Sequence, residues 1–162
     1  MKFLTQRIKS ALGMTSSSFE LDYEQLIHLD AEDLAEGGIQ QAYADLRAKL
    51  QAWIPEPAVL EQAVADDGSR YSVTCAGRRY TISGPDVPAG DAWGRAAWAL
   101  FDIVNCQLEE QAVRFYAING GNDLSGLFLD AQQADGARNA LPRRLDWPYL
   151  PTLEDAWFGQ PH

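Results

Sequence analysis

Two apolar runs flank a short polar cluster within residues 114–130. Residues 115–118 and 124–129 are mainly apolar, and residues 119–123 between them read Asn-Gly-Gly-Asn-Asp. Aromatic and β-branched residues favour strands, whereas glycine, asparagine and aspartate accept the positive φ angles of a tight reversal. The pattern predicts an antiparallel hairpin within residues 114–130.

Helical spacing is clearest in residues 39–54. Apolar residues recur there at steps of four, three, four and three, on one side of a helix: Ile39, Tyr43, Leu46, Leu50 and Trp53. Pro55 and Pro57 follow directly and end the pattern, because proline lacks the amide hydrogen that a continuing helix needs. Helical spacing in residues 3–12 predicts a further short helix near the N-terminal end.

Residues 91–110 predict a longer helix with apolar residues on more than one side. Asp91 is a suitable N-cap. One face is lined by Trp93, Ala97, Leu100, Val104 and Leu108. Further apolar residues widen this face, so we expect the helix to lie buried across a sheet. Asp102 would then be partly enclosed and need a charged partner, for which Arg95 and Arg114 are the candidates.

Strict alternation predicts a second hairpin over residues 71–83, with Ala-Gly at residues 76–77 as its turn. The residues expected to face inward are Tyr71, Val73, Cys75, Tyr80 and Ile82. Residues 58–65 fit either a strand or a helix, as short apolar runs usually do.

The C-terminal part begins with a capping-box pattern. Asp130 and Gln133 have the spacing with which a helix start satisfies two backbone amides, and Leu-Pro at residues 141–142 ends that helix. An extended, proline-rich tail follows, and we expect Trp147, Tyr149 and Trp157 to hold it against the domain.

These elements predict an α+β fold. We expect one domain over residues 1–162, in which a small antiparallel sheet of hairpins packs against a long buried helix and an N-terminal helical region. Residues 1–54 would be mainly helical and acidic. Residues 55–162 would contain the hairpins, the buried helix and the extended tail.

The composition describes an acidic protein that can form a core. The 162 residues carry a net charge of −10 and 46% hydrophobic residues, including five Trp, six Tyr and six Phe. This hydrophobic content excludes disorder as the general description. The acidic charge argues against nucleic acid as a direct ligand, because phosphate contacts need clustered Lys and Arg.

The cysteine content and the hydropathy of the chain predict its cellular compartment. Cys75 and Cys106 are too few for a disulfide scaffold or a zinc motif, and their apolar neighbours predict two buried, reduced thiols. Residues 1–9 lack the apolar core of a signal peptide, and no window reaches the roughly 18 apolar residues of a membrane span. We therefore expect a cytoplasmic protein with no membrane partner.

Residues 20–36 are the most one-sided charged segment, with seven acids and no Lys or Arg. The acids are Glu20, Asp22, Glu24, Asp30, Glu32, Asp33 and Glu36. Leucines within the segment indicate an ordered acidic face. Two interpretations remain open: a solvated face, or a docking surface for a basic protein that would relieve the mutual repulsion and speed encounter.

Signals for catalysis are weak. The chain has only two histidines, His28 and His162, and no nucleophile-elbow, Walker, dinucleotide or His-Glu-x-x-His motif. Glu24 and His28 have helical spacing, but two ligands do not make a metal site. We therefore expect no enzyme, no catalytic residue, no metal and no cofactor.

The tip of the 114–130 hairpin has three interpretations. Its Asn and Asp side chains can bond their own backbone in a simple turn. Asn122 and Asp123 can instead contact a partner, or Asp123 can be catalytic. Neither the order of calcium ligands in an EF-hand nor a following helix supports an ion or phosphate loop here.

A set of short motifs lies mainly between residues 91 and 162. They are Trp93-Gly94-Arg95, Phe101-Asp102-Ile103-Val104-Asn105, Arg-Phe-Tyr-Ala-Ile-Asn-Gly-Gly-Asn-Asp-Leu at residues 114–124, Asp146-Trp147-Pro148-Tyr149-Leu150-Pro151 and Trp157-Phe158-Gly159-Gln160-Pro161, with a weaker likeness at residues 29–35. Together they resemble immunity proteins of bacterial contact-dependent growth inhibition and related toxin systems. The resemblance implies toxin neutralisation but carries no functional residues over.

The first functional hypothesis is an immunity protein that binds a cognate toxin domain, often a nuclease in such systems, and neutralises it by stoichiometric occlusion. Its acidic surface would cover the basic cleft of the toxin, with the hairpin tip residues Asn122 and Asp123 as a second contact patch. The alternative is a small hydrolase or ligand-binding domain that uses the Asn119 to Asp123 loop with Asp102 or Arg95. A third possibility is an adaptor whose partner is not a toxin.

Overall fold

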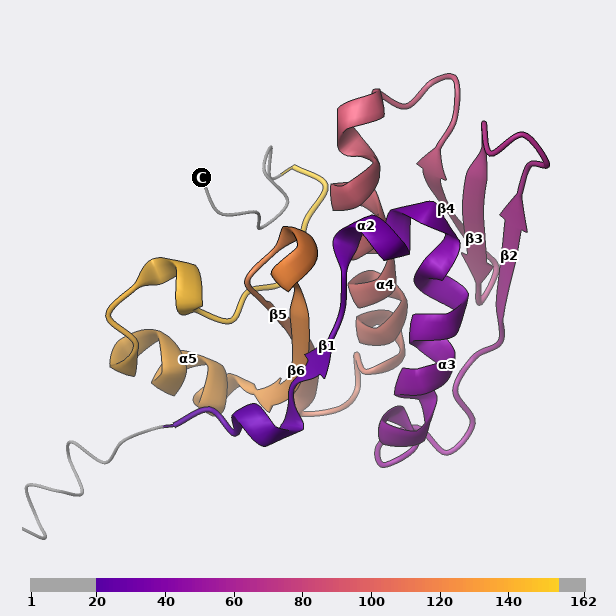
Figure 1. Cartoon of the computed structure of the whole chain (residues 1–162). Coiled ribbons are helices and arrows are strands. Elements are labelled where there is room, and N and C mark those ends of the chain that lie inside the picture. The colour runs from indigo at the N-terminus through magenta and orange to yellow at the C-terminus, as the bar shows by residue number, and fades with distance from the viewer. Residues whose placement is uncertain (1–19, 155–162) are drawn as a thin grey trace, which may run out of the picture.

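Two three-stranded antiparallel sheets and four helices make up the α+β fold, which the computed structural model describes for residues 20–154 (Figure 1). Sheet A has the strand order β1 (Ile27–His28), β6 (Ser125–Asp130), β5 (Val113–Ile118). Sheet B has the order β2 (Leu60–Val64), β3 (Tyr71–Cys75), β4 (Arg78–Ser83). The helices are α2 (Ala31–Asp33), α3 (Ile39–Leu50), α4 (Ala92–Gln107) and α5 (Ala131–Ala140). The expected fold class is confirmed, while the helix expected at residues 3–12 lies outside the described residues.

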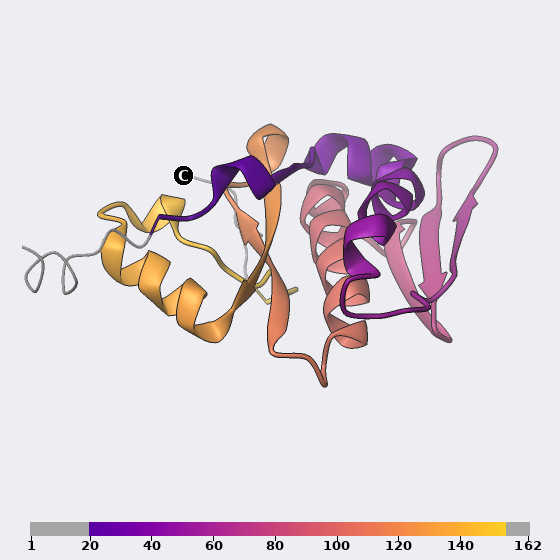
Figure 2. The same ribbon diagram turned by 90° about the horizontal axis from the view of Figure 1, so that it is seen from below.

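The main core lies between the two sheets. Figure 2 shows α4 between sheet A and sheet B, with α3 beside it, and α5 on the far side of sheet A. Buried residues of α3, α4 and the inner face of sheet B form one apolar cluster with Phe115 and Ala117 of β5. A second cluster joins Tyr116 and Ile118 of β5 to Ala134 and Ala137 of α5. Sheet A is therefore covered on both faces.

The long helix α4 is buried on several sides, as its sequence predicts, and its two ends differ in detail from the expectation. Asp91 makes no side-chain capping bond, because its backbone belongs to the short helical turn Ala89–Asp91. At the other end, the Arg114 guanidinium donates hydrogen bonds to the carbonyls of Leu108, Glu109 and Gln111. These carbonyls belong to the turn that follows α4, which stops at Gln107, so Arg114 holds this turn against the start of β5.

The hairpin of β5 and β6 is confirmed. Ala117 pairs with Gly126, and Gly126 has no side chain because the Phe115 ring occupies the space that a Cβ would fill. Phe115 stacks on Phe101 of α4 with ring centroids 4.5 Å apart. The tip is longer than a two-residue turn, since Gly121–Asp123 forms one short helical turn.

The outer edge of β5 is covered by the Asn105 side chain and by the C-terminal tail. The Asn105 side chain accepts from the Phe115 amide at 2.7 Å and donates to the Phe115 carbonyl at 2.9 Å. The tail residue Tyr149 exchanges backbone hydrogen bonds with Ala117. Trp147 donates its indole N–H to the Leu141 carbonyl at 2.9 Å, so the tail lies on the domain as expected. Trp157 lies outside the described residues.

Residues 20–36, which carry the seven acids, contain a strand, although residues 1–54 are expected to be mainly helical. Residues 27–28 form β1, which adds to sheet A by pairing Ile27 with Gly126. Helical backbone continues from α2 through Gly37 and Gly38 into α3, with a kink at Gly37, whose φ is 110°. A Cβ on Gly38 would lie 2.5 Å from the Asp33 carbonyl oxygen, so this close turn needs glycine.

Sheet B confirms the predicted hairpin and resolves the open region before it as strand β2. Tyr71, Val73 and Cys75 are buried, as expected for the inner face. The expectation of two buried thiols is half wrong: Cys75 is buried, but Cys106 is exposed.

Candidate functional site

The seven acids of the sequence-predicted surface fall into two groups at opposite ends of β1 (Figure 1). Glu20, Asp22 and Glu24 lie before β1, around the short helical turn Tyr23–Gln25, and all three are exposed. Asp30, Glu32, Asp33 and Glu36 lie after β1, in and around α2. We call this second group the α2 acids. The extended backbone of β1 therefore separates what the sequence presents as one continuous face.

The α2 acids and the hairpin tip meet in one surface. The Asn122 side-chain amide donates to Asp30, with 3.2 Å to each carboxylate oxygen, and to Glu32 Oε2 at 3.1 Å. Asp30 also caps α2 by accepting from the Glu32 amide at 2.9 Å. Asp123, next to Asn122, is exposed. Asn122 thus bonds α2 and not its own backbone, and the two predicted patches are contiguous.

A groove of about 470 Å³ lies on the other side of Asp30, between β1, α2 and α3. Four of its lining side chains are acidic: Asp30, Asp33, Glu36 and Asp45. Apolar atoms of Ile27, Leu29, Leu34 and Ala42 form other parts of its wall. We call this the acidic groove. It combines negative charge at the rim with apolar surface, which suits a long cationic side chain.

The four carboxylates of the acidic groove form no ion pair with another described residue. Asp45 accepts a hydrogen bond from Gln41 at 2.9 Å. Lys49, one helical turn beyond Asp45, instead donates to the Gln25 carbonyl at 3.4 Å. Close like charges without a counter-charge give a negative potential that favours a cationic ligand.

The structure gives no support to a metal site at His28. Glu24 lies in a short helical turn and His28 in a strand, so the two are not on one helical face. Within residues 20–154, no group of three or more His, Cys, Asp or Glu side chains is arranged to hold a metal ion.

Asp102 is paired, but with a residue that the sequence does not indicate. Its carboxylate lies 2.9 Å from Arg78 Nη1 and accepts from the Tyr80 hydroxyl at 2.8 Å. The expected partners are wrong: Arg95 donates to the Thr81 carbonyl, and Arg114 binds backbone carbonyls near the end of α4. Packing of the β3–β4 hairpin against α4 brings Arg78 to Asp102, and the local sequence around Asp102 contains no sign of it.

The cluster around Asp102 is suited to structure and not to nucleophilic chemistry. The Arg78 guanidinium carbon lies 5.1 Å from the centre of the Tyr80 ring and 5.6 Å from that of Trp98. Two main effects raise the pKa of the Cys106 thiol: partial burial is the larger, and the negative charge of the adjacent Asp102 carboxylate is the smaller. A thiol with a raised pKa stays protonated at neutral pH and is a poor nucleophile.

Asp45, Gln41 and His28 all line the acidic groove, although the sequence does not place them in a shared site with the α2 acids. Gln41 and Asp45 lie one turn apart on the wet side of the predicted 39–54 helix, which is the only sequence signal that they share a face. Only the packing of α3 beside α2 places them near Asp33 and Glu36.

Comparison with known proteins returns no relative from which function can be read: no protein-family model, no curated protein and no solved structure matches this chain. Among the described residues, no helix has both the length and the apolar character needed to cross a membrane.

Proposed function

We propose that the chain is a non-catalytic binding protein that docks a basic surface of a partner protein in its acidic groove. The partner we propose is a cognate toxin domain in the same cell, so that the chain acts in the cytoplasm as an immunity protein. Neutralisation would occur by stoichiometric occlusion of the toxin's basic cleft.

One observation carries this proposal: the hairpin tip and the α2 acids form a single acidic surface that continues into the acidic groove. Asn122 connects the tip to the α2 acids through Asp30 and Glu32. The groove acids Asp33, Glu36 and Asp45 form no ion pair with another described residue. An unpaired set of this kind accelerates encounter with a cationic partner and opposes binding of nucleic acid.

The groove also favours a particular side chain on the partner. A Lys or Arg inserted between Asp33, Glu36 and Asp45 would place its charge among the carboxylates and its methylene groups against Leu34 and Ala42. Arginine fits best, because its planar fork can bind two carboxylate oxygens at once. The other three acids, Glu20, Asp22 and Glu24, would add long-range attraction from the far end of β1.

Charge reversal tests the surface. The triple variant Glu32→Lys, Asp33→Lys, Glu36→Lys should slow association with the cognate toxin domain by about tenfold or more at low salt. The difference should shrink as salt rises, because screening removes long-range attraction. Stopped-flow association rates at several salt concentrations measure this effect.

A matched control reverses three exposed acids elsewhere, namely Asp66, Glu109 and Glu110. This control has the same change in net charge, so its smaller loss of rate would localise the effect. An unchanged rate in the α2 variant with intact fold would remove the acidic surface from the mechanism. Failure of the two wild-type proteins to bind, together with no protection of cells that express the toxin, would remove the immunity function itself.

The contacts at the hairpin tip favour binding over the alternative, a hydrolase that uses the Asn119 to Asp123 loop. Asn122 is bound by α2, and the Asn119 carbonyl accepts a hydrogen bond from the Tyr149 hydroxyl. Asp102 is held by Arg78 and Tyr80, which belong to sheet B. Asn122, the Asn119 carbonyl and Asp102 are thus engaged in separate structural contacts, whereas Asp123 is exposed at the tip.

A further inference from the structure

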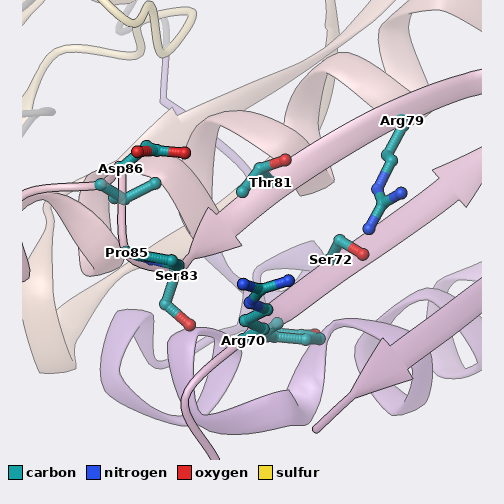
Figure 3. Close-up of a pocket in the computed structure, with 10 residues that line it drawn as sticks. Arg70, Ser72, Arg79, Thr81, Ser83, Pro85 and Asp86 are labelled. Carbon is teal, nitrogen blue, oxygen red and sulfur yellow. The ribbon is translucent and has the colours of Figure 1, made fainter.

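The outer face of sheet B carries a pocket of about 200 Å³ that uses no residue of the acidic groove (Figure 3). Strand register decides which side chains face it. Ser72 of β3 pairs with Thr81 of β4, and Tyr80 beside Thr81 points into the core. Because side chains alternate along a strand, Arg79, Thr81 and Ser83 share the outer face. The loop of residues 84–87 forms the remaining wall.

Two guanidinium groups line this pocket, one on each side of Ser72 (Figure 3). Arg70 enters from the start of β3 and Arg79 from β4. Neither forms an ion pair with a described residue, although the chain has 23 acids against 13 Lys and Arg. Other arginines, such as Arg78, Arg138 and Arg143, each hold a carboxylate. In this acidic chain, two unneutralised guanidinium groups around one pocket form a local positive site.

Ser72 gives this pocket a second, independent feature. The residue is only 6% exposed, yet it lines the pocket, and its hydroxyl forms no hydrogen bond with another described residue. No side-chain oxygen among the described residues is both fully buried and without a hydrogen-bond partner, so the Ser72 hydroxyl is accessible at the surface of the pocket. It is therefore free to bind a ligand atom inside the pocket.

The polarity of the pocket indicates what that ligand carries. The hydroxyls of Ser72, Thr81 and Ser83 and the two guanidinium groups all line the pocket and can donate hydrogen bonds. Asp86 lies on the loop at the side away from Arg79 and presents an acceptor (Figure 3). Arginine forks match phosphate oxygens in charge and geometry, and a carboxylate accepts hydrogen bonds from hydroxyl groups.

We propose that this pocket binds the phosphate group of a small phosphomonoester that also carries a hydroxyl. Arg70 and Arg79 donate to the phosphate oxygens together with Ser72, and Asp86 accepts from the ligand hydroxyl. The volume is below the roughly 300–1,000 Å³ of ordinary small-molecule sites, so the organic part has only a few atoms. The inference stands apart from the proposed docking function, since it uses other residues.

An NMR titration of the full chain tests the site with glycerol 3-phosphate as the probe. Saturable shifts of the backbone amides of Ser72, Thr81 and Gly84 are expected. Inorganic phosphate should give the same shifts with weaker affinity, and glycerol should give none. Binding of inorganic phosphate with no binding of glycerol 3-phosphate would overturn the assignment to an ester, and the absence of saturable shifts with either would overturn the site.

Matched variants distinguish specific binding in this pocket from general electrostatic attraction of the phosphate to exposed arginines. Arg70→Gln with Arg79→Gln should weaken glycerol 3-phosphate binding by about tenfold or more, through loss of charge-assisted hydrogen bonds. Arg47→Gln with Arg144→Gln removes the same charge from exposed positions elsewhere and should change the affinity by less than about twofold. Ser72→Ala, a smaller change, should still weaken binding several-fold. Equal losses in the two arginine variants would overturn the proposal.

Discussion

The two sheets of this protein are of similar size but have opposite relations to solvent. Sheet A is covered by α4 on one face and α5 on the other, and β5 has its outer edge bonded to Asn105 and the tail. Sheet B is covered on one face only, and its outer face carries polar residues. The sequence reflects this difference, because β5 is nearly continuously apolar whereas β4 alternates.

This difference decides where each sheet can take part in function. Sheet A presents little besides its tip, where Asn122 joins the α2 acids. Sheet B presents a whole face, on which Arg79, Thr81 and Ser72 surround a pocket. The two candidate sites thus have opposite charge and use different parts of the fold.

The largest expected difference in the free energy of unfolding is between a buried residue of sheet A and a residue on the outer face of sheet B. Phe115→Ala in sheet A should lower the free energy of unfolding by about 3–5 kcal/mol, because it empties space between Phe101 and Phe128. Thr74→Ala on the outer face of sheet B should cost less than about 1 kcal/mol. Urea unfolding of both variants measures the difference. Similar losses would mean that the two faces are not as unequal as their burial indicates.

A smaller effect compares the two polar attachments of α4. Asn105→Leu leaves the Phe115 amide and carbonyl of sheet A without partners and should cost about 1–3 kcal/mol. Asp102→Asn weakens the contact with sheet B and should cost less than about 1 kcal/mol, because the Arg78 side chain is 54% exposed to screening water. Chemical unfolding at neutral pH measures the loss of unfolding free energy in each variant. A larger loss for Asp102→Asn would show that the contact with sheet B stabilises the protein more than the contact with sheet A.

Alkaline pH should test the inner face of sheet B. Burial raises the pKa of Tyr71 to about 12, against an ordinary value of 10.0. The unfolded chain therefore loses this proton first, so the stabilisation is complete below pH 10 and is lost as pH rises toward 12. Tyr71→Phe should be less stable at pH 8, because the Ile39 amide and Gln62 lose a partner, but its unfolding free energy should fall less between pH 9.5 and 11.5. Parallel curves for the two proteins in that interval would contradict the assigned cause.

The smallest expected effect compares the charge of the two surfaces. Glu36→Gln in the acidic groove should raise stability by a few tenths of a kcal/mol at low salt, since it relieves repulsion among carboxylates. Glu61→Gln should give no gain, because Glu61 lies on the outer face of sheet B, where Thr74 separates it from Arg79. Thermal unfolding at low and high salt measures both, and a gain that persists at high salt would exclude a charge effect.

Much of the fold could be predicted because its signals are local. The two hairpins, the stripe of α3 and the capping box of α5 each lie within a few neighbouring residues, and all are present. Errors appear where a distant segment decides the outcome. Residues 27–28 are a strand because β6 offers them an edge, and Asp102 finds Arg78 because a hairpin packs on its helix.

The sequence by itself determined the two hairpins, the helices α3, α4 and α5, the inner face of the 71–83 hairpin and the excess of acids near the N-terminus. Only the tertiary structure decided which of those acids share a surface, since Asn122 reaches Asp30 across 92 positions of the chain. It also decided that Arg70 and Arg79 flank a buried serine. The physical reason is that periodicity and capping act over one or two turns, whereas a site is made of side chains that meet only when separate elements pack together.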